Sequence, residues 1–75
     1  MFVAIWDRET IEHIAANDIT PDEVDYVLAR PFDRTISRSS NRPLVFGTTK
    51  TGRLLAVVFE EIDEINVYII TAYEV

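Results

Sequence analysis

Cysteine is absent from this chain of 75 residues, so neither a disulfide nor a thiolate metal site can form. The single histidine excludes a zinc site built on paired histidines, and two glycines are too few for a glycine-rich phosphate-binding loop. No apolar segment approaches the roughly 20 residues that span a bilayer, and the first residues lack the pattern of a signal peptide. We therefore expect one cytoplasmic domain over residues 1–75, without metal, cofactor or membrane contact.

Basic residues are also scarce. The chain has 13 acidic and 7 basic residues and a net charge of −6, which argues against a nonspecific nucleic-acid binder. Six of the seven basic residues nevertheless lie between positions 30 and 53: Arg30, Arg34, Arg38, Arg42, Lys50 and Arg53. Two interpretations stay open, a local basic patch on an acidic protein or solvated arginines that keep a small domain soluble.

The most apolar part of the chain is a predicted hairpin from Arg53 to Tyr73. Leu54–Phe59 is an unbroken apolar run, which is typical of a strand covered on both faces. A strand over 65–73 follows after an acidic turn near residues 62–64, and Thr49–Gly52 forms the connection to the strand before. Because an isolated hairpin is marginal in water, the rest of the chain has to cover it.

Two short helices are predicted before this sheet. Asp7 follows a first strand over residues 2–6 and caps a helix that ends near Asn17–Asp18. The apolar stripe of this helix is Ile11, Ile14 and Ala15.

The second helix has the clearest start signal in the chain. Thr20 is the cap, Pro21 occupies the first helical position, and Glu23 completes a capping box. This helix ends after Ala29, and its apolar stripe is Val24, Val27 and Leu28.

Further strands over residues 35–38 and 44–49 give the order β-α-α-β-β-β-β. This order predicts an α+β domain with the two helices on one face of a small antiparallel sheet. If Leu55, Val57 and Phe59 face the helices, alternate residues of the same run are apolar and face away. Either the sheet curls on itself or a partner covers this second face. We favour a partner, either another protein or a second copy that forms a homodimer.

Three segments resemble a known family over nearly the whole chain. They are Trp6-Asp7 before a short helix, the Ile-Thr-Pro-Asp-Glu-Val helix start at 19–24, and the Thr-Gly-Arg-Leu-Leu-Ala-Val-Val-Phe hairpin at 51–59 with Ile-Ile-Thr-Ala-Tyr at 69–73. The chain is similar to the BrnT-type toxins of type II toxin–antitoxin systems. The resemblance implies a RelE-like fold, RNA cleavage, and a cognate antitoxin as partner. The chain departs from the family at Tyr73, where an arginine is typical, and at residues 16–18, where Lys-His-Gly is typical.

Metal-independent RNA cleavage needs cations for the developing phosphorane charge and groups that transfer protons. The candidate catalytic residues are Arg53, His13 and Tyr73, and the candidate RNA-binding residues are Arg38, Arg42 and Lys50. Tyr68 also qualifies, but its odd separation from Tyr73 places the two on opposite faces of a regular strand. Each candidate catalytic residue also has a purely structural interpretation. Arg53 would be a hairpin arginine paired with an acid, His13 a residue at the boundary of the core, and Tyr73, like Tyr68, a side chain packed in the core or an interface.

Two functions are therefore expected from the sequence. The first is a toxin-like endoribonuclease, with degenerate or absent catalytic residues, that an antitoxin inhibits. The second is a non-catalytic interaction or dimerisation domain of the same fold. The acidic composition favours the second, and the family resemblance favours the first.

Overall fold

The computed structural model describes residues 2–75 as an α+β fold of two helices and five strands, in the predicted order. The elements are β1 (Val3–Ile5), α1 (Arg8–Ala16), α2 (Pro21–Ala29), β2 (Asp33–Ile36), β3 (Pro43–Thr48), β4 (Leu54–Glu61) and β5 (Asn66–Glu74). The main boundary error is at β2, which begins two residues before the predicted strand. The Ser37 N–H, which donates to the Arg42 carbonyl, already belongs to the turn. Neither helix described over residues 2–75 is long and apolar enough to cross a membrane.

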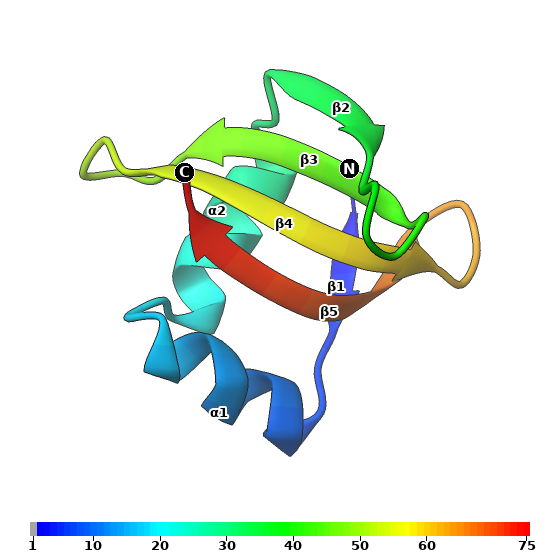
Figure 1. Ribbon diagram of the computed structural model, residues 1–75, viewed down its shortest axis with the longest axis horizontal. Coiled ribbons are helices and arrows are strands. Elements are labelled where there is room, and N and C mark those ends of the chain that lie inside the picture. Colours follow the sequence, from blue (N-terminus) through cyan, green and yellow to red (C-terminus); the bar gives the residue numbers. More distant parts are fainter. Residues whose placement is uncertain (1) are drawn as a thin grey trace.

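The five strands form one mixed sheet in the order β1-β5-β4-β3-β2. The neighbours from β2 to β5 are antiparallel, but β1 runs parallel to β5, with Val3 opposite Asn66 and Ile5 opposite Tyr68. Figure 1 shows β1 (blue) beside the first half of β5. The prediction of an entirely antiparallel sheet is therefore wrong at this edge, because β1 pairs with a strand about 60 residues away and local sequence does not specify that direction.

The caps of both helices confirm the local predictions. The Asp7 carboxylate accepts the N–H of Thr10 at 2.7 Å. The Thr20 hydroxyl accepts the N–H of Glu23 at 3.2 Å, and the Glu23 carboxylate accepts the N–H of Thr20 at 3.0 Å. This reciprocal pair satisfies two backbone donors that the first helical turn leaves free. Asp18 then has a φ of 61°, the left-handed conformation expected for an Asn-Asp helix end.

The two helices contribute unequally to the core. All three predicted stripe residues of α2 are buried, whereas α1 buries only Thr10 and Ile14. Ile11 is 37% exposed and Ala15 is exposed, so the stripe predicted for α1 is confirmed at Ile14 and wrong at these two residues. The reason is that α1 lies beside β5 rather than over the middle of the sheet (Figure 1). Its C-cap residue, Asn17, donates a side-chain hydrogen bond to the carbonyl of Ala72 at 3.0 Å.

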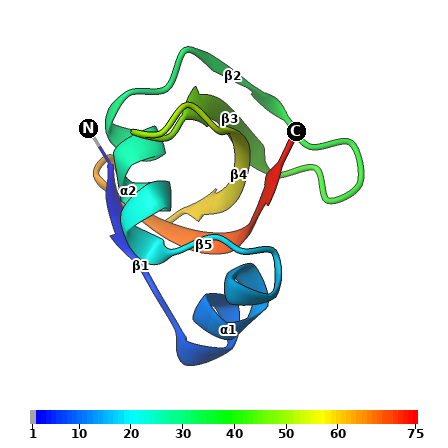
Figure 2. The same ribbon diagram turned by 90° about the vertical axis from the view of Figure 1, so that its left-hand side faces the viewer.

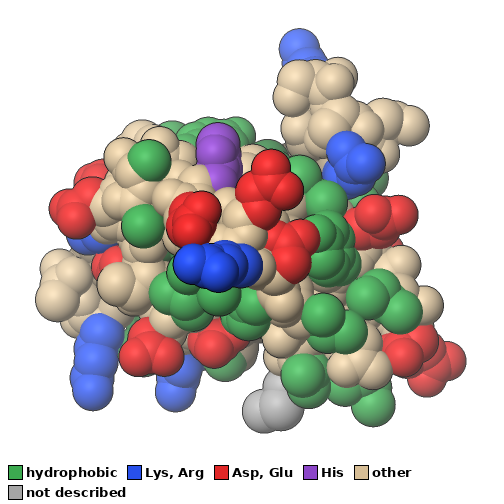
Figure 3. Space-filling view, turned by 90° about the horizontal axis from the view of Figure 1, so that it is seen from below, with side chains coloured by type: hydrophobic (Ala, Val, Ile, Leu, Met, Phe, Trp, Pro, Cys, Tyr) green, Lys and Arg blue, Asp and Glu red, His purple; other side chains and the backbone are tan. Residues whose placement is uncertain are grey.

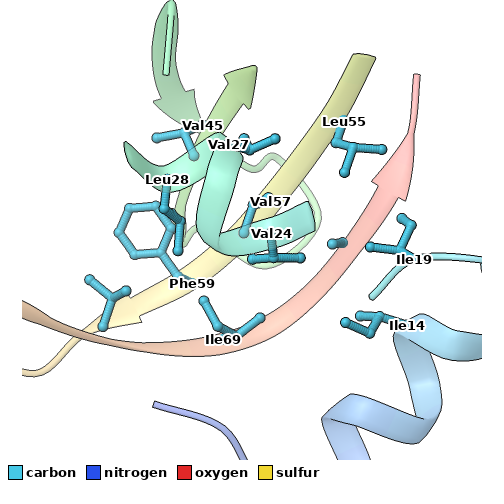
Figure 4. Packing of buried hydrophobic residues seen from close by; sticks show 12 residues of the cluster. Ile14, Ile19, Val24, Val27, Leu28, Val45, Leu55, Val57, Phe59 and Ile69 are labelled. Carbon is cyan, nitrogen blue, oxygen red and sulfur yellow. The ribbon is translucent and has the colours of Figure 1, made fainter. Parts of the chain in front are cut away.

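The sheet curves around α2, which packs in its hollow (Figure 2). The main core lies between them and joins α2 to alternate residues of the three longest strands, among them Leu55, Val57 and Phe59, as predicted. Figure 4 shows the ring of Phe59 beside Leu28 of α2. The ring of Phe2 packs 5.4 Å from that of Phe59.

The opposite side of the sheet, which we call the outer face, has its own small apolar cluster. Leu44, Ala56 and Val58 are buried there, and Phe46 and Ile70 pack against them half-buried. The alternation predicted for the run that begins at Leu54 is thus confirmed for Ala56 and Val58.

A β-bulge changes which side chains of β5 reach the outer face. Val58 lies opposite Thr71 and Phe59 lies opposite Ile69, so Ile70 is an extra residue in β5. The bulge reverses the side-chain alternation along the strand. Tyr73, opposite Ala56, and Tyr68, opposite Glu60, therefore lie on the same outer face. The prediction that the two tyrosines point to opposite faces assumed a regular strand and is wrong.

Candidate functional site

Arg53, the predicted charge-stabilising residue, is held on the helix side of the sheet by acidic groups and a backbone carbonyl. Its Nη1 donates to Glu23 Oε2 at 3.0 Å and to the carbonyl of Asp18 at 2.8 Å. Its Nε and Nη2 donate to Glu74 Oε1 at 3.1 and 3.0 Å. The hydrogen bond that Arg53 donates to Glu74, together with the neighbouring carboxylate charges, raises the pKa of Arg53 against the opposing effect of burial.

These contacts describe a structural clamp. A guanidinium has five N–H donors, and four hydrogen bonds to protein groups start from that of Arg53. Two carboxylates neutralise its charge, and the clamp joins the start of β4 to α2 and to the end of β5. Stabilising a phosphorane would require Arg53 to leave these partners.

The other predicted catalytic residues do not gather around Arg53. Tyr73 lies on the outer face, 42% exposed, on the opposite side of the sheet from the Arg53 clamp. His13 is exposed in the last turn of α1. Proton transfer and charge stabilisation at one phosphate need groups within hydrogen-bond reach of each other, and the three residues are distributed over three parts of the surface.

The predicted RNA-binding residues lie at opposite ends of β3. Arg38 and Arg42 belong to the β2–β3 loop, whereas Lys50 is in the β3–β4 turn. The six residues of β3 separate these two positions by about 20 Å at the rise of an extended strand. The structure thus distributes these three cations instead of forming one patch.

A groove lies where α1 approaches the outer face of β5, and His13 is among the residues that line it. It has a volume of about 390 Å³. Its walls come from the start of α1 and from the bulged part of β5: Asp7, Glu9, Thr10, His13, Tyr68, Ile70 and Thr71. Figure 3 looks onto this side of the molecule, where acidic side chains (red) lie on one side of the histidine (purple), with a basic side chain (blue) next to them. The groove therefore combines an acidic wall with a floor of sheet residues.

A hydrogen bond joins Tyr68 and Asp7, two of the residues that line this groove. The Tyr68 hydroxyl donates to Asp7 Oδ2, while the other oxygen of Asp7 caps α1. The bond from Tyr68, and then the N–H of Thr10, lower the pKa of Asp7. The same bond, and then burial, raise the pKa of Tyr68. Asp7 is therefore an anion at neutral pH, and Tyr68 is its hydrogen-bond donor.

We expect Tyr68→Phe to raise the pKa of Asp7 toward its ordinary value, because the substitution removes the largest cause of the lowering. A carboxyl with a lowered folded-state pKa contributes stability above its unfolded pKa of about 3.9, and this contribution is lost as pH falls through the folded pKa. The variant should therefore lack much of this contribution at neutral pH, and its stability should fall less than that of the wild type on acidification below about pH 4. NMR titration of the side-chain carboxyl measures the shift directly.

Asp63 supplies the internal control for that titration. Its pKa is lowered by hydrogen bonds from the Asn66 side chain and from the N–H groups of Asn66 and Ile65, and Tyr68 contributes to none of them. Its titration should be the same in both proteins. An unchanged pKa of Asp7 in Tyr68→Phe would contradict the assignment of this hydrogen bond as the main cause.

A second hollow, of about 420 Å³, lies at the other edge of the sheet, between β2 and the start of the chain. Its lining is mostly apolar, and Arg34, its one cationic wall residue, is paired with Glu61 at 2.9 Å. Phe32, which is 63% exposed, forms part of its rim. Over residues 2–75, no group of three or more His, Cys, Asp and Glu side chains is placed to hold a metal ion.

Sequence reasoning missed the roles of Asp7 and Ile70 in the groove. Asp7 was identified only as a helix cap, and Ile70 only as part of an apolar strand. The available signal was the tyrosine at position 68 near the middle of an otherwise apolar run, since a half-buried tyrosine hydroxyl needs a partner. That partner is 61 residues away in the chain, so the pairing itself had no local signal.

Comparison with known proteins identifies no relative. No protein-family model matches the sequence, and no curated protein and no solved structure matches it significantly. The likeness to BrnT-type toxins is therefore still a hypothesis that depends on the three sequence segments that suggested it.

Proposed function

We propose that this chain is a non-catalytic protein-binding domain, related in fold to the RelE-like toxins, that engages its partner through the outer face of the sheet. The observation that carries the proposal is the apolar character of that face. Ile5 on β1 and Tyr73 on β5 are 39% and 42% exposed there, and half-buried Ile70 on β5 and Phe46 on β3 belong to the same face. Exposed aromatic and aliphatic side chains above a packed apolar layer are typical of the centre of a protein interface.

The geometry of the cations supports the same proposal. Arg53 is bound by Glu23 and Glu74, and Arg38 and Lys50 lie at opposite ends of β3. With a net charge of −6, the domain lacks the electrostatic attraction that draws RNA to a nuclease. The proposal thus retains partner binding from the toxin resemblance and omits RNA cleavage.

A peptide selection tests this function. A random peptide library displayed on phage is selected on the immobilised domain, and the binders are then compared on variants that keep strand-forming residues. We expect Tyr73→Thr and Ile5→Thr to weaken binding by at least about tenfold, since central aromatic contacts are worth more than 1.4 kcal/mol. Phe32→Thr, which removes a more exposed aromatic residue outside the outer face, should leave binding unchanged. Peptides that bind more weakly to Phe32→Thr but equally well to Tyr73→Thr would show that the outer face is not the binding surface.

An RNA assay separates the proposal from the toxin alternative. The purified chain and its Arg53→Ala variant should both leave single-stranded and hairpin RNA intact. The variant should also melt at a lower temperature, because Glu23 and Glu74 lose their shared cation. RNA cleavage by the wild type that disappears in a folded Arg53→Ala variant would establish the nuclease and refute the proposal.

A further inference from the structure

The groove between α1 and β5 opens onto the outer face, so the two surfaces are continuous. Ile70 belongs to both, since it lines the groove and packs against the apolar cluster of Leu44, Ala56 and Val58. Tyr68 also lies on the outer face and lines the groove. A segment bound across the outer face would therefore pass the mouth of the groove.

Charge in the groove has one sign. Asp7 and Glu9 line it, and neither lysine nor arginine does. Arg8, between them in sequence, is 94% exposed and paired with Glu12 at 3.5 Å. His13 also lines the groove, together with Asp7 and Glu9. The groove thus offers two negative charges next to an apolar surface.

We propose that the partner is a basic amphipathic segment, whose apolar side chains pack on Phe46, Ile70 and Tyr73 while a lysine or arginine enters the groove. This inference rests on the proposed function and specifies the chemistry of the partner. Each element of the segment has a complement on the domain. Apolar groups meet the outer face, and an ammonium or guanidinium meets the carboxylates of Asp7 and Glu9.

A second copy of the chain fits this surface less well. A symmetric dimer presents the same patch on both subunits, so two acidic grooves would face a common interface. Each subunit also carries a net charge of −6, which opposes association at low ionic strength. A basic partner is instead attracted by the same negative charge.

Two synthetic peptides of equal length test the inference. Both carry leucine at the same positions, and the intervening positions are lysine in one and glutamate in the other. Affinity is measured by isothermal titration, and the bound surface is mapped by NMR chemical shifts. We expect the lysine peptide to bind about five- to tenfold more tightly at low salt, with the difference shrinking as salt is added. The largest shifts should be at Ile70, Tyr68 and Tyr73.

Glu9→Gln identifies the source of that preference without disturbing the helix cap that Asp7 forms. It should remove most of the advantage of the lysine peptide. Asp25→Asn makes the same change of charge on α2, on the other side of the sheet, and should not. If both variants lost the advantage of the lysine peptide equally, the preference would come from the net charge of the domain, and the inference would be wrong.

The outcomes also separate the inference from the proposed function. If both peptides shift the outer-face signals with equal affinity, the function stands and the basic partner is wrong. If neither peptide shifts these signals, both fail. Sedimentation could also show a dimer that Tyr73→Thr dissociates. In that case the partner would be a second copy of the chain and not a basic segment.

Discussion

Phe59→Ala should lower the free energy of unfolding by about 3 to 5 kcal/mol, as phenylalanine-to-alanine changes in cores do. The side chain is fully buried. It fills the space between the sheet and α2, with Leu28 beside it and the ring of Phe2 at 5.4 Å (Figure 4). A domain of 75 residues has a total stability of roughly 4 to 11 kcal/mol. One substitution therefore removes a large share of it.

Urea denaturation followed by far-ultraviolet circular dichroism measures this loss. Phe32→Ala is the matched control, because it makes the same chemical change at a side chain that is 63% exposed. It should change stability by less than about 0.5 kcal/mol. Similar losses in the two variants would mean that the packing around Phe59 is not what holds α2 to the sheet.

Gly47→Ala should destabilise the domain by about 1 to 3 kcal/mol through overpacking. Gly47 is buried in β3, where α2 crosses the sheet. A Cβ atom there would lie 2.8 Å from Val27 Cγ1 and 3.4 Å from the carbonyl oxygens of Val27 and Arg30. The valine side chain has little rotamer freedom in a helix, so α2 would have to move away from the sheet.

A double-mutant cycle with Val27→Ala tests this close approach. Val27→Ala alone destabilises by removing buried apolar surface, but it also removes the nearest atom to the added methyl group. In the Val27→Ala background, Gly47→Ala should therefore destabilise the domain less than it does in the wild type, with a coupling energy of at least about 0.5 kcal/mol. The free energies of unfolding of the four proteins are measured by urea denaturation. If the losses of the two single variants simply add in the double variant, the strain does not come from the contact with Val27.

The sequence predicted best those features that depend on neighbours in the chain. The capping box of Thr20 and Glu23, the cap at Asp7 and the helix ends need partners only three or four residues away. Gly52, with a φ of 90°, supplies the turn before β4 as expected. Backbone donors in the first helical turn have to be satisfied locally, so the residues that satisfy them can be read from the sequence.

Features that depend on distant partners were predicted poorly. The direction of β1, the narrow buried stripe of α1 and the bulge at Ile70 all follow from how segments meet in space. A bulge has no strong local signal in an apolar run, because every residue of the run suits either face. Its consequence is large, since it brings Tyr68 and Tyr73 to one face.

The same distinction applies to the candidate site. Arg53 was identified from its place after the hairpin glycine, and its two alternatives, a catalytic cation or a paired arginine, could not be separated in sequence. Glu23 and Glu74 are 30 and 21 residues away. Only the tertiary structure shows that both carboxylates, and the carbonyl of Asp18, converge on one guanidinium.

By itself, the sequence determined the class of fold, the helix boundaries, the acidic charge and the excess of apolar surface on the sheet. These properties are set by composition, by periodicity and by hydrogen bonds within one turn of chain. The tertiary structure decided which side chains share a surface. It placed Arg53 in a clamp, distributed the remaining cations, and joined an acidic groove to an apolar face, because long-range strand pairing and one extra residue in β5 determine where each side chain points.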